Sequence, residues 1–366
     1  MAVSFSPTSS PFTRAVVSSM RKLYPESLAE KSFDNTGLLL EAPYNHGRRQ
    51  KNSVLLAIDL TKAVADEAIA RKDSVVVAYH PIIFRGLKSL TLNDSQQQSL
   101  LRLAQAGISV YSPHTSVDAT PGGMADWLCD IVTGAITPST DSAASIPKSS
   151  SSATYSQPTY PQPGTVSPVS SQPHVRTTIH PSPAPVPEGM ESAGMGRLVT
   201  FDTPQFLTSI VDRIGKGVGY PGGIPIAIPQ LASVETMKIR TVGVCPGSGS
   251  SVLLKAPGGI PDLLFTGELS HHEALAAIEQ GSVVVALAHS NTERGYLHAV
   301  MREKLADALK KEWEVVRSEG LRTLGETPND NDGVVEALEM AYGDAEVFVD
   351  VSKRDRDPYG IMIRQA

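Results

Sequence analysis

The sequence is poor in cysteine and has no long apolar run. Only two cysteines, Cys129 and Cys245, occur among 366 residues, which is too few for a disulfide framework. Both lie in apolar stretches, a pattern typical of reduced, buried thiols in an intracellular protein. No window approaches the roughly 20 consecutive apolar residues that a membrane-spanning helix needs. We therefore expect no membrane partner.

Clustered positive charge is also missing. The chain has 32 Lys and Arg against 38 Asp and Glu, a formal net charge of −6. A dedicated nucleic-acid binder needs a dense basic surface to contact phosphates, and no run of Lys and Arg supplies one. Direct binding to nucleic acid is not expected.

The overall composition is that of an ordinary globular protein. Hydrophobic residues make up 41% of the chain and charged residues 19%. A chain of this length is long enough for two domains with their own cores.

The N-terminal stretch contains basic residues, namely Arg14, Arg21 and Lys22, and no acid before Glu26. A Ser-rich, acid-poor start resembles a mitochondrial presequence. The favoured alternative is that Phe12 to Leu23 forms the first amphipathic helix of the fold. The cytoplasm is therefore the expected location, with mitochondria as the alternative.

A Ser/Pro/Thr-rich segment at residues 137–187 interrupts the chain. Such a composition buries too little apolar surface to offset chain entropy, so this segment is predicted to be disordered. Its two histidines, His174 and His180, are interpreted as bystanders. The segment separates an N-terminal lobe (1–136) from a C-terminal lobe (188–366), and the latter contains a polar, acidic insertion at 317–344.

Strands and helices alternate in both lobes. Apolar strands such as SVVVAYH and SVVVALAH are followed by helical patterns such as SQQQSLLRLAQAG, which Gly107 closes. A final strand is predicted in AEVFVDVSKRDRDP, near the C-terminus. Repeated strand–helix–strand units with apolar strands predict an α/β fold with largely parallel sheets.

Polar side chains follow the ends of several predicted strands. His80 follows one strand, His114 and Asp118 follow the next, and His289 and Glu293 follow the last full strand. Ligand sites of open α/β sheets lie at the carboxyl ends of strands. Imidazole and carboxylate together suit Zn, Fe, Mn or Ni, and bridging carboxylates permit two ions about 3.5–4 Å apart.

The spacing of His289 and Glu293 has a local explanation. If Ser290 or Asn291 caps the following helix, the histidine lies just before its first turn and the glutamate lies within it. Each residue also has a structural alternative. His80 alone suits a hydrogen-bonded strand end, Asp118 a helix cap near Pro121, and Glu293 a first-turn acid favoured by the helix dipole. Both interpretations stay open at this point.

Five collinear blocks carry a family resemblance: YPESLAEKSFDNTGLLLE, AYHPIIFRGLKSL, YSPHTSVDATPGGMADWL, FTGELSHHEAL and HSNTERGYL. They resemble the signature blocks of the Nif-three-like family (NGG-one interacting factor three), whose bacterial members carry the label GTP cyclohydrolase 1 type 2 homologue. The blocks span both lobes and leave out the Ser/Pro segment and residues 317–344.

The resemblance implies two α/β domains with a dinuclear metal site in the cleft between them, in subunits that form a ring-shaped hexamer. The implied ligands are His80, Asp118, His289 and Glu293, with the two carboxylates bridging. Many bacterial members have two adjacent histidines where this chain has Tyr79 and His80. This departure removes one nitrogen ligand, so one or two ions per subunit are expected.

Other matching positions have supporting roles in this interpretation. Asp34 and Asn35 belong to a block near the cleft, and His114 would orient ligands from behind them. Glu268, His271 and His272 would act as acid/base or substrate-contacting groups, with helix capping and packing as the alternative for the histidine pair. A further block, CPGSGSS, offers glycines after a strand. A tight turn is favoured there over an anion-binding nest, because the Lys of a phosphate loop is missing.

The resemblance favours two functions from different classes. The first is a metal-dependent hydrolase that opens the ring of GTP or cleaves a phosphoester. The second is a non-catalytic metal-binding regulator or scaffold, because the family name refers to an interaction with a transcriptional adaptor.

Overall fold

The computed structural model describes residues 9–44, 51–137, 153–156, 158, 160, 165–166, 170–219, 223–325 and 334–364. The chain folds into two compact units. The first contains Met1–Ser116 and Met301–Asp355, and the second contains Val117–Val300 and Arg356–Ala366. Each unit has its own sheet, so the predicted α/β class with mixed, largely parallel sheets is confirmed.

Five strands form the sheet of the first unit, in the order β1-β4-β3-β2-β14. Their bounds are Gly37–Leu40 for β1, Ser53–Ala57 for β2, Val75–Ala78 for β3, Ser109–Ser112 for β4 and Phe348–Val351 for β14. Neighbouring strands are parallel, except that β1 pairs antiparallel with β4. Strands β2, β3 and β4 are buried at every position, as parallel strands with both faces covered must be.

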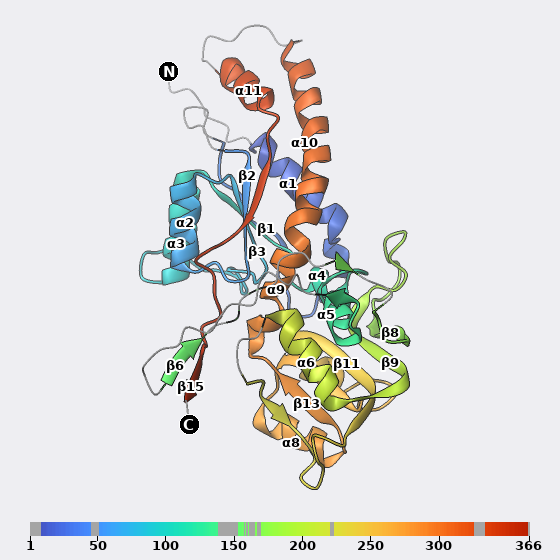
Figure 1. The fold of residues 1–366 in the computed structure, drawn as a ribbon. Helices are drawn as coiled ribbons and strands as arrows, with labels where there is room; N and C mark the ends of the chain where they lie inside the picture. Colours follow the sequence, from blue (N-terminus) through green and yellow to red (C-terminus); the bar gives the residue numbers. More distant parts are fainter. Residues whose placement is uncertain are drawn as a thin grey trace. The chain divides into compact units, whose positions relative to one another are not determined.

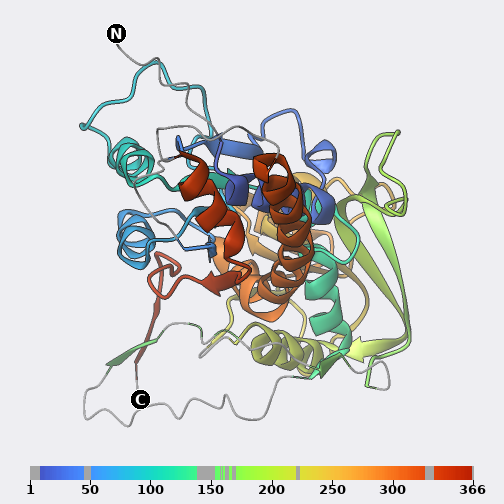
Figure 2. The same ribbon diagram turned by 90° about the horizontal axis from the view of Figure 1, so that it is seen from above.

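Helices cover the two faces of this sheet (Figure 1). They are α1 (Pro11–Leu23), α2 (Lys62–Arg71), α3 (Ser95–Ala106), α10 (Arg302–Gly325) and α11 (Val334–Gly343), with a short 3₁₀ turn η1 (Glu26–Leu28). Helices α2 and α3 lie on one face, and α1 runs beside α10 on the other, where the Phe12 and Trp313 rings meet edge to face at 5.4 Å. Helix α11 lies beside α10 (Figure 2).

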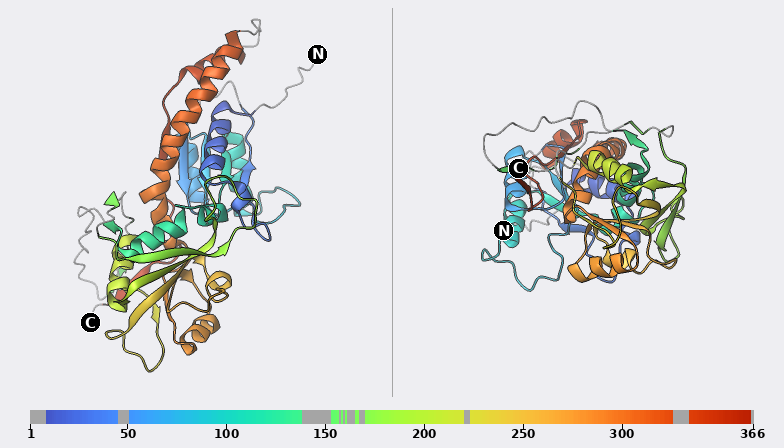
Figure 3. Two further views of the ribbon diagram at one scale, coloured as in Figure 1. Left: turned by 90° about the vertical axis from the view of Figure 1, so that its right-hand side faces the viewer. Right: turned by 60° about the horizontal axis from the view of Figure 1, so that its bottom comes forward.

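Six strands form the sheet of the second unit, in the order β10-β13-β12-β11-β9-β8. Their bounds are His174–Pro181 for β8, Gly194–Phe206 for β9, Ile226–Ala227 for β10, Lys238–Ser248 for β11, Leu263–Glu268 for β12 and Val283–Ala286 for β13. Strands β11, β12 and β13 are parallel, and β8, β9 and β10 join antiparallel. The long β8–β9 pair is visible in Figure 3.

The second unit also contains short helices and two small strand pairs. The helices are α5 (Met124–Thr133), α6 (Leu207–Val218), α7 (Ser250–Leu253), α8 (His271–Glu279) and α9 (Arg294–Tyr296), together with the 3₁₀ turn η3 (His289–Thr292) and the π turn η4 (Leu297–Met301). Helix α4 (Thr115–Ala119) contains the division between the units. The pairs are β5 (Ile136–Thr137) with β7 (Thr165–Val166), and β6 (Ala153–Ser156) with β15 (Ile361–Arg364).

The N-terminal stretch is the first helix of the fold. Helix α1 covers Pro11–Leu23, and its Ser10 cap accepts a hydrogen bond from the Thr13 amide. Phe12, Ala15 and Val16 are buried on the inner face of this helix. The interpretation of Phe12 to Leu23 as an amphipathic core helix is confirmed.

The structure differs from the predicted disorder at one end of the Ser/Pro segment. Strand β8 lies within residues 137–187 and pairs along its length with β9. Composition does not reveal this strand, because Ile179 is its one buried residue and its other positions are partly or fully exposed. Residues 138–152, where the segment is richest in Ser, lie outside the described residues.

The predicted polar insertion at 317–344 also differs from the structure. Helix α10 continues to Gly325, and α11 covers much of the remainder. The Trp313 indole donates to Asp344 O at 2.8 Å, and the Arg317 guanidinium donates to Tyr342 O at 2.9 Å. These contacts attach the segment to the first unit, although its exposed face is charged.

The units do not follow the predicted lobes. Strand β14, predicted as the last strand of the C-terminal lobe, pairs parallel with β2 in the first sheet. The contact division falls at 116/117 and at 300/301, away from the Ser/Pro segment. Pairing between strands so distant in sequence leaves no local signal.

The structure also describes the two cysteines and the apolar character of the helices. Cys129 and Cys245 are both free and buried, and burial raises the pKa of the Cys129 thiol to about 12. In the described part of the chain, no helix has both the length and the apolar character to cross a membrane.

Candidate metal centre

His289 and Glu293 lie together after the end of β13. The His289 Nε2 and Glu293 Oε1 atoms are 3.6 Å apart, and the Glu293 side chain is only 1% exposed. On the other side of the ring, His289 Nδ1 meets Glu268 Oε1 at 2.8 Å. With its proton on Nδ1, the imidazole directs the Nε2 lone pair toward the Glu293 carboxylate.

Gly247 leaves space beside these two donor atoms. Its φ is +59°, and a Cβ there would lie 2.8 Å from Glu293 Oε1 and 3.1 Å from His289 Nε2. Gly267 is similarly constrained, because a Cβ would meet His289 O at 2.4 Å. The backbone approaches the imidazole and carboxylate as closely as glycine allows, and a side chain at 247 would fill the space where a small ion fits.

Asp118 brings a second carboxylate to the same part of the second unit. It lies in α4 and is 5% exposed. Burial raises the pKa of the Cys245 thiol, and the charges of Asp118 and Glu293 raise that pKa further. Both carboxylates therefore act on one buried thiol on β11. Among the described residues, the donor atoms that lie close enough together to hold an ion include those of His289 and Glu293 and not that of Asp118. Imidazole with carboxylate is a mixed N/O set that suits a divalent ion.

Threonine hydroxyls fix the backbone around Gly247. Thr266 Oγ1 donates to Gly247 O at 3.0 Å, and the Gly247 amide donates to Thr292 Oγ1 at 3.0 Å. Thr292 Oγ1 in turn donates to His289 O at 3.0 Å. This chain of bonds ties the turn after β11 to η3, so the glycine and the donor residues hold a fixed geometry.

His80 lies at the end of β3 in the first unit. Its Nδ1 meets Asp59 Oδ1 at 2.9 Å, and its amide donates to Ile58 O. The Tyr79 ring is buried, with centroids 5.0 Å from His80 and 5.3 Å from His114. Tyr79 thus packs among the imidazoles of this unit.

His114 and Asp34 form a second imidazole–carboxylate pair in the first unit. His114 Nδ1 lies 2.6 Å from Asp34 Oδ1, and the Thr115 amide and hydroxyl donate to Asp34 Oδ2. Burial alone would raise the Asp34 pKa, but the bonds from His114 and Thr115 outweigh it and lower the pKa. The neighbouring Asn35 amide donates to Ile83 O. These predicted cleft residues therefore stabilise the strand-end loops.

The three imidazoles share one arrangement. Each has a carboxylate oxygen at Nδ1: Asp59 for His80, Asp34 for His114 and Glu268 for His289. Histidines that bind metal through Nε2 are usually held in this way. Asp59 was not among the predicted site residues, although it follows β2 as the other polar residues follow their strands.

The predicted cap of the last long helix is wrong. His289–Thr292 forms a 3₁₀ turn, followed by the short α9 and a π turn before α10 begins. Ser290 is buried, and its hydroxyl donates to Asp357 Oδ2 instead of capping a helix. The spacing of His289 and Glu293 therefore comes from an irregular segment.

His271 and His272 begin α8, where both are exposed. Ser270 is the helix cap and forms a reciprocal capping box with Glu273. The two imidazoles contact each other, with ring centroids 5.2 Å apart. The capping role considered for this pair belongs to its neighbours.

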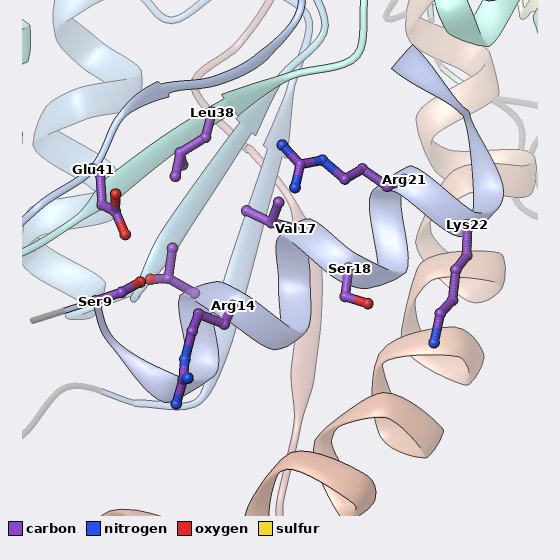
Figure 4. A pocket seen from close by; sticks show the side chains of 9 residues that line it. Ser9, Arg14, Val17, Ser18, Arg21, Lys22, Leu38 and Glu41 are labelled. Carbon is purple, nitrogen blue, oxygen red and sulfur yellow. The ribbon is translucent and has the colours of Figure 1, made fainter. Parts of the chain in front are cut away.

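A groove of about 430 Å³ lies beside α1 in the first unit (Figure 4). Arg14, Arg21 and Lys22 line it, but none of the predicted site residues does. Arg21 pairs with Glu26 at 2.9 Å, and Lys22 binds Glu312 on α10. These ion pairs give two of its three basic side chains a structural role.

Comparisons with known proteins show which family this chain is similar to. The model of the family described as Duf34/NIF3 (NGG1p interacting factor 3) matches residues 13–320. A Schizosaccharomyces pombe relative, Protein NIF3 homolog, is 40% identical over 294 residues, covering 80% of this chain and 88% of that protein. NGG1-interacting factor 3 from Saccharomyces cerevisiae is 35% identical over 297 residues, covering 80% and 90%.

A solved structure has the same fold. The Bacillus cereus protein related to NIF3 aligns with a TM-score of 0.59 at 18% sequence identity. The alignment covers 94% of this chain and 98% of that protein.

Proposed function

The chain belongs to the Duf34/NIF3 family, and from that premise we propose that it is a metal-dependent hydrolase of a nucleotide or another phosphoester. His289, Glu293 and Asp118 are the proposed ligands from the second unit, and His80 is the proposed ligand from the first. His80, His289 and Glu293 together could hold a metal ion. The donor types suit Zn, Fe, Mn or Ni.

The observation that carries the proposal is the surroundings of Glu293. This carboxylate is almost fully buried beside His289, and the Asp118 charge acts on the same buried thiol. A Cβ at Gly247 would lie 2.8 Å from Glu293 Oε1 and 3.1 Å from His289 Nε2. The space that the glycine leaves beside these two donor atoms is where we propose that a divalent ion binds.

The residues around the site would have different roles in hydrolysis. A bound divalent ion supplies the Lewis acidity that activates such a bond for attack by water. Glu268 and Asp59 hold His289 and His80 in the required tautomer and orientation. His271 and His272, exposed at the start of α8, are the proposed proton donors to the leaving group.

The test is turnover by metal-replete protein on a panel of nucleotides and phosphoesters, GTP included. Asp118→Ala and His289→Ala should each lose both metal content and turnover. Asp212→Ala removes an exposed partner of Lys216 on α6 and should leave both unchanged. Wild-type protein that carries its metal but cleaves nothing on the panel would rule the hydrolase out.

A second candidate is a non-catalytic metal-binding regulator or scaffold. Tyr79 stands where many relatives are expected to have another histidine, which reduces the ligand set. The Saccharomyces cerevisiae relative is named for an interaction with NGG1, which supports a transcription-related partner for this chain. We also expect self-assembly into a homo-oligomer, and a cytoplasmic location.

Affinity capture would separate the two candidates. Capture of one partner by wild type, with and without chelator, and by Glu293→Gln would show whether binding needs the metal. A partner retained equally in all three cases would assign the function to a surface outside the metal site.

A further inference from the structure

The segment that follows β14 contacts the loop that holds His80. In the first unit, Asp355 Oδ2 accepts hydrogen bonds from the Ile58 amide at 2.6 Å and from the Asp59 amide at 3.4 Å. Asp59 is the residue whose carboxylate holds His80. Asp355 therefore fixes the backbone that orients this imidazole.

Neighbouring contacts hold Asp355 in place. Ser352 Oγ accepts from the Asp355 amide at 3.0 Å, and the Ser352 amide donates to Leu56 O at 2.8 Å. The Ser352 hydroxyl donates to Glu67 on α2 at 2.5 Å. The chain after β14 is thus anchored to β2 and α2 of the first unit before it reaches Asp355.

Asp357 makes the corresponding contact in the second unit. Its Oδ2 accepts from the Ser290 hydroxyl at 2.5 Å, and the Arg294 Nε atom donates to the same hydroxyl at 2.8 Å. Asp357 and Arg294 are each only 2% exposed. Ser290 follows His289 and Arg294 follows Glu293, so this buried network holds the residue directly after each of these two proposed ligands.

Both oxygens of the buried Asp357 carboxylate accept hydrogen bonds. Its second oxygen, Oδ1, accepts from the Tyr359 amide at 2.8 Å. The nearby Arg294 guanidinium compensates the buried negative charge through Ser290. A buried charge with this many defined contacts fixes one geometry and is costly to disturb.

We propose that Asp355 and Asp357 are positioning residues for the metal, and that binding of the ion and docking of the segment Asp355–Arg356–Asp357 stabilise each other. Only Arg356 separates the two aspartates in the sequence, so release of one anchor disturbs the other. Thermodynamic coupling is reciprocal: a docked segment raises metal affinity, and bound metal slows undocking. The inference rests on the metal binding in the proposed function and not on hydrolysis.

The test measures how metal affinity changes when the Asp357 carboxylate is removed. Zn²⁺ or Mn²⁺ affinity is measured by competition with a chelator for wild type, Asp357→Ala and Asp357→Asn. Loss of a group that orients ligands typically costs about 10–100-fold in metal affinity, and Asp357→Ala should show a loss of that size. The near-isosteric Asp357→Asn should recover part of it.

Asp350→Ala is the matched control. Asp350 lies on β14, a few residues earlier, and its exposed carboxylate pairs with Arg71. The control should bind metal as wild type does. Equal affinities for Asp357→Ala and wild type would overturn the proposal, as would an equal loss in the Asp350→Ala control.

A measurement on wild type avoids dependence on folding of the variants. Hydrogen exchange of the Asp355 and Tyr359 amides should slow when Zn²⁺ or Mn²⁺ is added, and Glu293→Gln should not show this slowing. Exchange that is unaffected by a metal that demonstrably binds would contradict the coupling. Wild type that binds neither ion would instead overturn the proposed function itself.

Discussion

Gly247 is the residue at which size alone decides what the site can hold. A methyl group there would lie 2.8 Å from Glu293 Oε1 and 3.1 Å from His289 Nε2. Contacts of that length would force the two donor atoms to move or would exclude a bound ion. Substitution of this one residue therefore tests the donor geometry directly.

Gly247→Ala should reduce metal affinity by about tenfold or more, in the range seen when ligand orientation is disturbed. The substitution also places a non-glycine residue at positive φ, which costs about 1–2 kcal/mol of stability. Chelator competition measures the affinity, and urea unfolding measures the stability.

Gly189→Ala separates the two effects. Gly189 has a φ of +78° with no atom within 4 Å of a built Cβ. It should show the same backbone strain as Gly247→Ala and keep full metal affinity. Equal affinities for the two variants would mean that the donors do not converge beside Gly247.

The Asp34 carboxylate should make stability depend on pH in a defined direction. Its pKa is lowered in the folded protein because His114 and Thr115 outweigh burial. A lowered pKa stabilises the fold above the unfolded value of about 3.9 and loses this contribution as the pH falls through the folded pKa. Asp34→Asn should therefore be less stable than wild type at pH 7, by about 1–3 kcal/mol.

The gap between wild type and Asp34→Asn should narrow below about pH 4. Urea unfolding in the presence of chelator, from pH 7 to pH 3, measures it. Asp212→Asn, at an exposed site, is the control and should show little difference at any pH. A gap that stayed constant with pH would mean that the ionised carboxylate is not the source of the stability.

The site residues were predicted from their positions after apolar strands. His289, Glu293 and Asp118 follow apolar runs that became β13 and β4. The side chains that contact these residues could not be predicted, because the sequence does not show which carboxylate lies next to a given imidazole. Asp59 was missed for that reason, and Asp357 contacts Ser290 from 67 residues away.

Helices α10 and α11 pack against each other, although residues 317–344 were predicted to be a polar insertion. The Tyr342 and Trp313 rings stack at 6.2 Å, and Gly320 on α10 lies under Tyr342. A Cβ at Gly320 would be 2.3 Å from Tyr342 Cζ. The two helices can therefore approach closely only because residue 320 lacks a side chain.

Gly320→Ala should destabilise the protein by about 1–3 kcal/mol, the usual cost of overpacking. In an exposed helix the same change normally stabilises by up to about 1 kcal/mol. Urea unfolding measures whether the free energy of unfolding falls or rises.

Gly325→Ala, on the same helix with no atom within 4 Å, is the matched control and should be neutral or stabilising. If both substitutions changed the free energy of unfolding in the same direction, α11 would not pack on α10 through Tyr342.

The elements that the sequence predicted share a strong local pattern. Strands β3 and β13 are continuous apolar runs, VVVA in each case, and α3 ends at Gly107 in the left-handed conformation. Strands β8 and β9 were not predicted, because each mixes exposed polar with buried positions and depends on its partner. The prediction for residues 317–344 was wrong for the same reason. Most charged residues that the structure describes in this region are exposed, and the sequence does not reveal the contacts of its inner face.

The chain passes three times between the two units. It leaves the first unit after Ser116, returns at Met301, and leaves again after Asp355. Composition located the Ser/Pro segment but not these crossings, since the boundary of a unit is set by long-range pairing such as that of β14 with β2. Periodicity predicted the α/β class and composition predicted two lobes, but neither shows which strands pair across the sequence.

The most direct test of the account is metal quantification on purified protein. Wild type equilibrated with Zn²⁺, Mn²⁺, Fe²⁺ or Ni²⁺ and then desalted should retain at least about one ion per chain. Glu293→Gln and His289→Ala should each lose most of it, while Asp212→Ala retains it. Wild type that keeps no ion under any of these conditions, or variants that keep as much as wild type, would contradict the central claim.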